Sequence, residues 1–308
     1  MTECERLIEN GTFSPDFFKE EIRSDFLVTT ERKKIWAIQI DLALQLDRVC
    51  QKYGLQYFLF FGSLLGAVRH KGYIPWDNDF DVCLPRNDYD KLLGLAHEFC
   101  APYFFQTPHT DKGHAYCHIQ IRNSNTAGII RQFMYQGFNL GIGIDVLALD
   151  AFENSEQGRE TFAEINRIQR DNSTFMRTQN PSLSESDRIR VREYLSRHRD
   201  PINDYERYNV LAKSFSDSNC DTVCCTSASL YGWQRDIFAA SDFKCFEKCP
   251  YEGFCFPIPN GYDSILKTIY GDYMTLPPIE ERGLWHGTTD FHPDEPYTKF
   301  IMSRSVPA

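Results

Sequence analysis

The run Tyr57–Phe61 constrains the fold most, because its five consecutive apolar residues form a β-strand with no polar face to expose. The segment before it, Thr30–Lys52, places apolar residues at spacings of three and four and is followed by Gly54, which predicts an amphipathic helix and its end. A strand buried on both faces and covered by helices is typical of α/β proteins. We therefore expect Tyr57–Phe61 at the centre of a sheet in a mixed α/β fold.

Patterns downstream predict the other elements of this α/β half. They are a short helix from Gly62 to His70, a strand over Asp79–Leu84 with alternating polar and apolar residues, a helix from Asn87 to about Phe99, and strands near Tyr103–Gln106, Ala115–Arg122 and Ile142–Leu149.

The chain divides into three predicted regions. Residues 24–150 form a mixed-sheet core, and residues 151–219 form an Arg-rich helical insertion in which Ser184 and Asp187 start a helix. Residues 220–308 form a loop-rich C-terminal segment with one predicted helix, Tyr262–Tyr270, and complete the same domain.

Charge and cysteine content limit the partners and the compartment. The chain has 33 Lys and Arg against 43 Asp and Glu, a formal net charge of −10, so its overall field repels nucleic acid. The N-terminus has no apolar leader, and no apolar run is long enough for a membrane span. Eleven cysteines without an export signal favour reduced thiols. We expect a cytoplasmic protein, with peripheral attachment to the inner membrane face left open.

An acidic motif downstream of Gly62-Ser63 is the strongest functional signal. On a strand, Asp79 and Asp81 point to one face about 6.6 Å apart, and Asp77 directly precedes them. The two charges repel by roughly 2.5 kcal/mol at an effective dielectric constant of about 20, and a divalent cation reverses this repulsion. Oxygen ligands favour Mg²⁺ or Mn²⁺, and the glycine turn lets backbone N–H groups approach a phosphate. The pattern predicts metal-assisted phosphoryl chemistry, although an isolated acidic motif is more often a solvated strand.

Three blocks of the sequence resemble one family. GSLLGAVRHKGYIPWDNDFDVCLPRNDY (residues 62–89), GIDVLALD (143–150) and YGDYMTLPP (270–278) are similar to the LicD family of the nucleotidyltransferase superfamily, which has a polymerase-β-like fold. The resemblance covers about residues 30 to 290 and omits mainly the helical insertion. It implies transfer of a phospho-alcohol, typified by phosphocholine from CDP-choline, to a glycan, with fukutin-type ribitol-phosphate transferases as distant relatives.

The resemblance assigns roles to the carboxylates. Asp79 and Asp81 would bind the metal with help from Asp77, and Asp145 would be the third carboxylate and the base for the acceptor hydroxyl. Asp145 alternates with apolar neighbours, as expected of a carboxylate that projects from a buried strand, although it could also be a capped strand end. We expect Asp150, at the end of the same block, to be a turn residue or helix cap.

Several cations and one aromatic residue could contact the donor. Arg69, His70 and Lys71 could bind phosphate or, equally, complement the negative end of their helix. Arg122 could hold a diphosphate, although a single Arg more often forms a surface ion pair. Trp76 could contact a base or a quaternary ammonium, or pack in the core.

Residues late in the chain are open to two interpretations. Their cysteine spacings could serve a structural Zn²⁺ site, but simple reduced thiols are the commoner outcome. His286, close to Asp290, could act as a base. The cysteines concerned are Cys220, Cys224, Cys225, Cys245, Cys249 and Cys255.

We predict a Mg²⁺-dependent phosphotransferase that uses a CDP-alcohol donor and a glycan acceptor, free or lipid-linked. One alternative is nucleotidyl transfer from an NTP to a small molecule or protein, which releases pyrophosphate instead of CMP. The other alternative is a noncatalytic, zinc-stabilised scaffold in which the acidic strand is only a surface.

Overall fold

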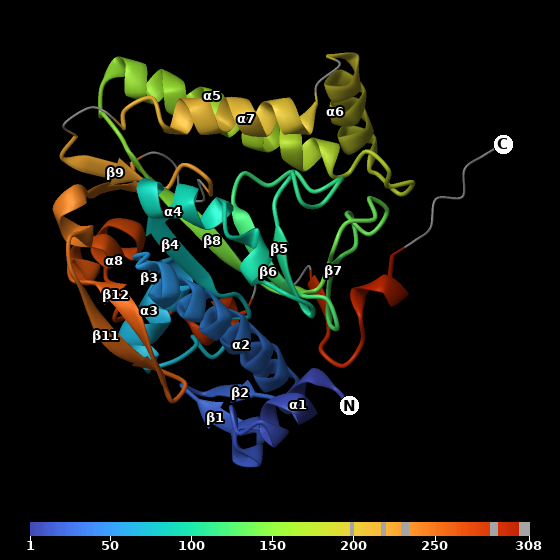
Figure 1. Cartoon of the computed structure of the whole chain (residues 1–308), viewed down its shortest axis with the longest axis vertical. Coiled ribbons are helices and arrows are strands. Elements are labelled where there is room, and N and C mark those ends of the chain that lie inside the picture. Colours follow the sequence, from blue (N-terminus) through green and yellow to red (C-terminus); the bar gives the residue numbers. More distant parts are fainter. Residues whose placement is uncertain (198–199, 217–219, 229–233, 284–288, 302–308) are drawn as a thin grey trace.

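The structure is a computed structural model, which describes residues 1–301 except 198–199, 217–219, 229–233 and 284–288. It is a mixed α/β fold, as predicted (Figure 1). A seven-stranded sheet lies at its centre, and the largest hydrophobic core packs on this sheet and the helices beside it.

The central sheet is built around β8 (Ile142–Ala151). Parallel to β8 runs β4 (Asp81–Pro85), whose other neighbour is the antiparallel β3 (Phe58–Leu59). Two further antiparallel pairs continue from β8: β6 (Ile119–Asn123) with β5 (Tyr103–Gln106), and β9 (Thr222–Cys224) with β10 (Ile237–Ala239). The strands near 103–106, 115–122 and 142–149 are thereby confirmed, with shifted ends.

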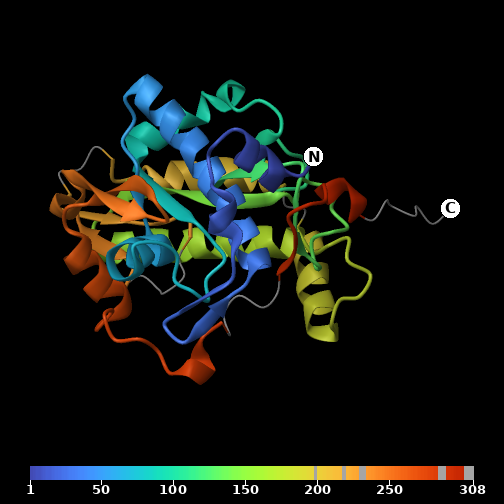
Figure 2. The same ribbon diagram turned by 90° about the horizontal axis from the view of Figure 1, so that it is seen from below.

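Helix α2 (Thr30–Tyr53) confirms the predicted amphipathic helix and is largely buried. Thr29 accepts a hydrogen bond from the backbone N–H of Arg32 (3.2 Å) at its start, and Gly54 ends it in the left-handed conformation (φ 64°). The N-terminal helix α1 (Glu3–Glu9) packs on α2, and an ion pair between Arg6 and Asp41 (2.7 Å) joins the two helices. Figure 2 shows this N-terminal segment against α2.

The remaining elements surround this centre. They are α3 (Phe61–His70), α4 (Arg86–Leu93), α8 (Tyr262–Tyr270), and three strand pairs: β1–β2 (Glu21–Arg23 and Phe26–Val28), β7–β13 (Ala127–Ile130 and Thr289–His292) and β11–β12 (Phe246–Tyr251 and Phe254–Pro259).

The prediction that the apolar run Tyr57–Phe61 lies at the centre of the sheet was wrong. Only Phe58 and Leu59 form a strand, and β3 ends the hydrogen-bonded order of the sheet instead of lying at its centre. The run is nevertheless buried, because β12 packs beside β3 and all five side chains join the main core. The β11–β12 hairpin, and not a further strand of the central sheet, thus covers the apolar run.

Other boundaries also differ from the predictions. Strand β4 starts at Asp81, so Asp79 lies in the loop before it, and α4 runs from Arg86 only to Leu93. Helix α3 ends at His70, as predicted, and Lys71 (φ 57°) takes the left-handed conformation directly after it. The C-terminal segment contains the predicted helix α8 and, in addition, the short strands β9 to β13, which the sequence analysis did not predict.

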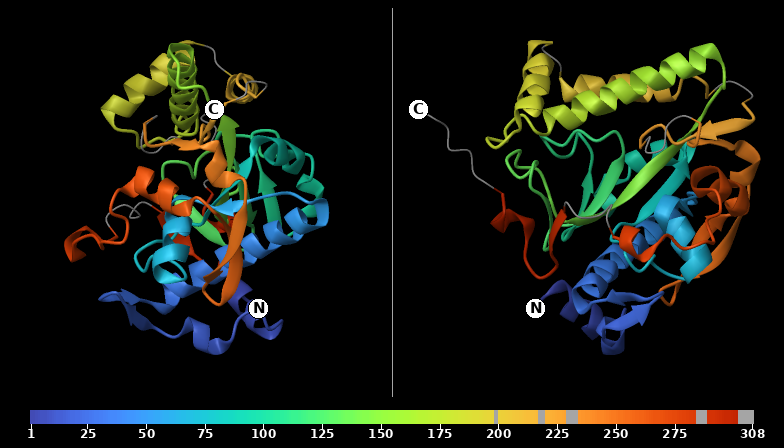
Figure 3. Two further views of the ribbon diagram at one scale, coloured as in Figure 1. Left: turned by 90° about the vertical axis from the view of Figure 1, so that its left-hand side faces the viewer. Right: turned by 180° about the vertical axis from the view of Figure 1, so that it is seen from behind.

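The insertion is helical, as predicted, with α5 (Glu156–Phe175), α6 (Glu185–Ser196) and α7 (Pro201–Ala212). Ser184 accepts a hydrogen bond from the backbone N–H of Asp187 (3.1 Å) at the start of α6. Helices α5 and α7 pack side by side along one end of the sheet (Figures 1 and 3). The division at residues 150 and 219 stays a prediction. None of the helices in the described ranges is both long and apolar enough to cross a membrane.

Candidate functional site

Two of the predicted carboxylates lie side by side on neighbouring strands. Because β4 and β8 are parallel, their register places Asp81 directly opposite Asp145. On the other side of β8 the partner of Asp145 is Gln120 of β6. Opposed residues point to the same face of a sheet, so these three side chains form a polar row across strands that are about 4.8 Å apart. Asp81 and Asp145, far apart in the sequence, are thereby brought together.

The two carboxylates of this row have different electrostatic surroundings. Asp81 is 9% exposed, and its burial, together with the charges of Asp79 and Asp145, raises its pKa well above the usual range. Burial acts in the same direction on Asp145, but His118 and a hydrogen bond from the Gln120 amide (2.6 Å) outweigh it and lower the pKa of Asp145 to about 2. A carboxylate with so low a pKa is a weak proton acceptor. The surroundings of Asp145 thus suit cation binding better than the predicted role of base.

Asp77 and Asp79 lie in the loop before β4, and one face of α2 holds this loop. The backbone carbonyl of Asp77 accepts hydrogen bonds from Arg32 Nη1 (2.7 Å) and Trp36 Nε1 (3.0 Å), and the next carbonyl accepts one from Gln39 Nε2 (2.8 Å). Positions 32, 36 and 39 share one helix face. Asp77 is buried, whereas Asp79 is exposed. The sequence analysis missed this support, although polar residues within the apolar pattern of α2 were the available signal.

Gly62 and Ser63 lie in the first turn of α3, inside the helix and not in a turn before it. A Cβ atom at Gly62 would lie only 2.8 Å from Asp77 Oδ2, so any larger residue at this position would displace the Asp77 carboxylate. The hydroxyl of the buried Ser63 accepts a hydrogen bond from the backbone N–H of Asp81 (2.9 Å). Phe61, just before, has φ 41°, a strained value for a bulky residue at the sharp change from β3 to α3. The structure therefore places the Gly-Ser pair in contact with Asp77 and Asp81.

The predicted phosphate-binding cations differ in their surroundings. Arg69 is half-buried and donates to His70 Nε2 (2.9 Å) and to the carbonyl of Tyr273 (2.6 Å), while Lys71 is exposed. Burial, together with nearby arginines, lowers the pKa of His70 to about 4, so this ring is neutral at pH 7. The contact with Tyr273 brings the block at residues 270–278 beside α3.

Arg122 is neither on the surface nor open to a ligand. It is 6% exposed, and its guanidinium donates to Gln106, to the carbonyl of Gly141 (2.6 Å) and to Gln120 Oε1 (2.5 Å). Every nitrogen of the guanidinium therefore has a partner within the protein. Arg122 orients Gln120, which in turn contacts Asp145.

Asp150 was also placed wrongly by the sequence analysis. It is 0% exposed inside β8 and accepts hydrogen bonds from Arg86 Nε (2.5 Å) and from Thr226. Arg86 also contacts the hydroxyl of Tyr208 in α7 (3.3 Å). This buried ion pair ties the sheet to the helical insertion.

His118 is a candidate site residue that the sequence analysis missed. It is 7% exposed, its Nε2 lies 3.5 Å from Asp145 Oδ1, and its ring stacks on Tyr116 (5.1 Å between centroids). Neither ring nitrogen has a hydrogen-bond partner within the described residues. Its position two residues before Gln120, on the same face of an extended segment, was the available signal.

Trp76 packs against Phe26 and Arg282 and is 8% exposed, which agrees with the core-packing interpretation. Asp290 is exposed on β13, 3.9 Å from Arg131 and 3.5 Å from His292. His286 lies outside the described residues.

The metal predictions can be compared with the side chains present. Over the described ranges, no three His, Cys, Asp or Glu side chains are grouped closely enough to hold a metal ion by themselves. Zn²⁺ needs such a protein cage, so the zinc prediction gains no support. Mg²⁺ is commonly bound by one or two carboxylates together with substrate phosphates. The adjacent oxygen donors of Asp81 and Asp145 fit this open kind of site.

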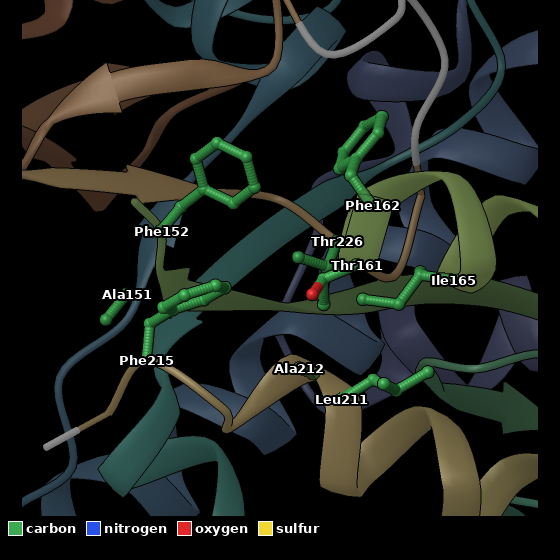
Figure 4. A pocket seen from close by; sticks show the side chains of 9 residues that line it. All are labelled: Ala151, Phe152, Thr161, Phe162, Ile165, Leu211, Ala212, Phe215 and Thr226. Carbon is green, nitrogen blue, oxygen red and sulfur yellow. The ribbon is translucent and has the colours of Figure 1, made fainter. Parts of the chain in front are cut away.

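A small pocket lies elsewhere, between the end of β8 and helices α5 and α7 (Figure 4). Its lining is mostly apolar, with the rings of Phe152, Phe162 and Phe215 around it and no charged side chain. It lacks the groups that phosphoryl chemistry needs, so the carboxylates remain the candidate site.

Comparison with known proteins defines the class first. Residues 54–138, which carry α3, the acidic loop, β4 and Gln120, match the family described as LicD/FKTN/FKRP, nucleotidyltransferase domain. Part of the chain thus matches a LicD-family model, which confirms the resemblance found in the sequence.

Individual relatives extend the match. The chain is 23% identical to the lipopolysaccharide cholinephosphotransferase LicD of Haemophilus influenzae over 249 residues, which cover 77% of this chain and 89% of that protein. It is also 40% identical over 48 residues to the uncharacterized protein RP689 of Rickettsia prowazekii, which is 16% of this chain and 18% of that protein.

Proposed function

We propose that this protein is a Mg²⁺-dependent transferase that moves a phospho-alcohol group, such as phosphocholine, from a CDP-alcohol to a hydroxyl of a glycan. The observation that carries the proposal is the register of β4 and β8, which sets Asp81 against Asp145 beside the start of α3. The similarity to a lipopolysaccharide cholinephosphotransferase supports phosphocholine as the group and a surface glycan as the acceptor.

In this proposal the residues have distinct roles. Asp81 and Asp145 would hold the metal, with Asp77 and Asp79 adjoining. When bound, Mg²⁺ would offset the charge of the donor diphosphate and of the CMP leaving group. Backbone N–H groups at Gly62 and Ser63 would contact a donor phosphate.

The proposed transfer is a single displacement at phosphorus. The acceptor oxygen forms a bond to the phosphorus of the phospho-alcohol, the bond from that phosphorus to CMP breaks, and the hydroxyl proton passes to a carboxylate. Asp79 suits this last role better than Asp145, because it is exposed and because the pKa of Asp145 is low. A cytoplasmic location and attachment to the inner membrane face stay predictions.

Nucleotidyl transfer is the second candidate, because the matching family is described as a nucleotidyltransferase domain. The noncatalytic scaffold has no support from the comparisons, since the relative that aligns along most of the chain is a transferase.

The test is a donor panel incubated with the full chain and Mg²⁺. CDP-choline, CDP-ribitol and CDP-glycerol are compared with the four NTPs, and the products are separated by chromatography. The proposal predicts CMP from at least one CDP-alcohol, slowly in water and faster with a lipopolysaccharide acceptor. Release of pyrophosphate from an NTP, without release of CMP from any CDP-alcohol, would contradict the proposal and indicate nucleotidyl transfer.

A further inference from the structure

Arginines from three parts of the chain are linked to Trp76, beside the acidic loop: Arg282 directly, Arg32 through Phe26 and Arg69 through His70. The guanidinium of Arg282 lies 4.8 Å from the centre of the Trp76 ring, and the ring of Phe26 lies 6.0 Å from it. Arg32 stacks over Phe26 at 5.5 Å. Arg69 is bonded to His70, whose ring lies 6.1 Å from Trp76. We call Arg32, Arg69 and Arg282 the arginine cluster.

No carboxylate neutralises the arginine cluster in the parts of the chain that the structure describes. Its guanidiniums donate hydrogen bonds to backbone carbonyls instead. Arg32 donates to the carbonyl of Asp77 (2.7 Å), and Arg69 donates to the carbonyl of Tyr273 (2.6 Å). Arg282 donates to the carbonyls of Ser24 and Pro277 (2.6 and 3.0 Å). Burial lowers the pKa of Arg32, and the charge of Asp77 opposes this effect. Burial and the charge of Arg282 lower the pKa of Arg69. The cluster is therefore a concentration of positive charge that a bound anion would stabilise.

Each arginine of the cluster keeps a donor for a ligand. Within the described residues, the Nη2 atoms of Arg32, Arg69 and Arg282 donate to no protein acceptor. All three side chains are half-buried. Guanidiniums that are fixed by carbonyls on one side present the other side to a phosphate with little further ordering.

The arginine cluster is contiguous with the carboxylates. Arg32 binds the carbonyl of Asp77, and the carboxylate of Asp77 abuts Gly62 at the start of α3. Arg69 lies near the other end of the same helix, about 10 Å from Gly62 at about 1.5 Å per residue. A second phosphate of the donor, or a phosphate of the acceptor, could therefore contact the arginine cluster while the reacting phosphate lies at the carboxylates.

We propose that the arginine cluster binds a phosphate group of a substrate, either the diphosphate of the donor or a phosphate on the acceptor glycan. The proposal rests on the proposed function only in requiring a substrate that bears phosphate. It adds Arg32 and Arg282, which lie far in sequence from the acidic motif, to the substrate-binding residues.

The test is calorimetric binding to the full chain, without Mg²⁺, of three probes: CDP, inorganic pyrophosphate and glucose 6-phosphate. Arg282→Gln and Arg69→Gln are compared with Arg48→Gln, an exposed arginine that pairs with Glu98 on another face. Loss of one charge-assisted hydrogen bond should weaken binding at least about tenfold in the first two variants and leave the control unchanged. Weakening for CDP and pyrophosphate assigns the cluster to the donor, and weakening for the sugar phosphate assigns it to the acceptor.

Wild-type affinity in both variants, or no binding of any probe to the wild type, would overturn the proposal. Circular dichroism and thermal melting check folding, and Arg282→Lys, which keeps the charge, replaces Arg282→Gln if the latter does not fold. Because this assay needs no turnover, its result is separate from that of the donor panel.

Discussion

Replacing Asp81 by Asn should remove activity and at the same time stabilise the fold. Asp81 is 9% exposed, faces Asp145 across strands about 4.8 Å apart, and receives no hydrogen bond on its carboxylate from the described residues. Two charges at this distance repel by about 3.5 kcal/mol at an effective dielectric constant of about 20. Asp145 is 36% exposed, so solvent screening reduces the net effect to about 1 kcal/mol. The amide has nearly the same volume, so no cavity opposes this gain.

The stabilisation should depend on pH in a defined direction. The pKa of Asp81 is higher in the folded than in the unfolded state, so its ionisation opposes folding. The difference between Asp81→Asn and wild type should therefore be absent below about pH 4 and grow as pH rises through the folded-state pKa.

The assay is urea unfolding in EDTA at pH 4 and pH 7, together with CMP release from CDP-choline in Mg²⁺. Asp16→Asn, an exposed carboxylate paired with Lys19, is the control and should change neither property. Transfer activity of Asp81→Asn should fall at least about a hundredfold, since a metal ligand is lost. Near-normal activity, or destabilisation by more than about 1 kcal/mol at pH 7, would refute the reasoning.

Three further predictions concern the support of the site. Gly62→Ala should displace the Asp77 carboxylate and reduce activity, whereas Gly94→Ala, which places its Cβ 3.4 Å from a carbonyl, should not; steady-state kinetics of both variants decide. Arg86→Met should lower the free energy of unfolding by about 3–5 kcal/mol, because it leaves Asp150 charged, buried and without its ion pair; Arg86→Met with Asp150→Leu should recover most of this loss in urea titrations. The pKa of His70, lowered to about 4 in the folded state, favours its neutral form, so its contribution to stability should be present above about pH 6.5 and be lost as pH falls to about 4. Melting temperatures of His70→Gln should therefore fall less than those of wild type between pH 7 and pH 4, and equal falls would contradict this prediction.

Local patterns in the sequence predicted an element well where its structure depends mainly on residues within that element. The spacing of apolar residues in α2, the cap at Ser184 and the stop after Tyr270 depend on neighbours within a few residues. The pairing of Asp81 with Asp145 could only be inferred through the family resemblance, because strand register depends on residues far apart in the chain.

The incorrect predictions also concern properties that depend on contacts between residues far apart in the chain. Asp150 and Arg122 carry charges that sequence reasoning places at a surface, but each is buried because partners from other elements satisfy it. The apolar run at β3 could equally be covered by strands or by a hairpin, and its composition does not distinguish them. His118 belongs to the site only because β6 lies next to β8.

The central claim, intact transfer of a phospho-alcohol to a glycan, can be tested by following a label. CDP-choline with a deuterated choline is incubated with the full chain, Mg²⁺ and a lipopolysaccharide acceptor, and the acceptor is analysed by mass spectrometry. We expect the glycan to gain one labelled phosphocholine for each CMP released above the slow release in water, with Asp81→Asn producing neither. A glycan that gains a cytidylyl group instead, with the label left on free phosphocholine, would contradict the account.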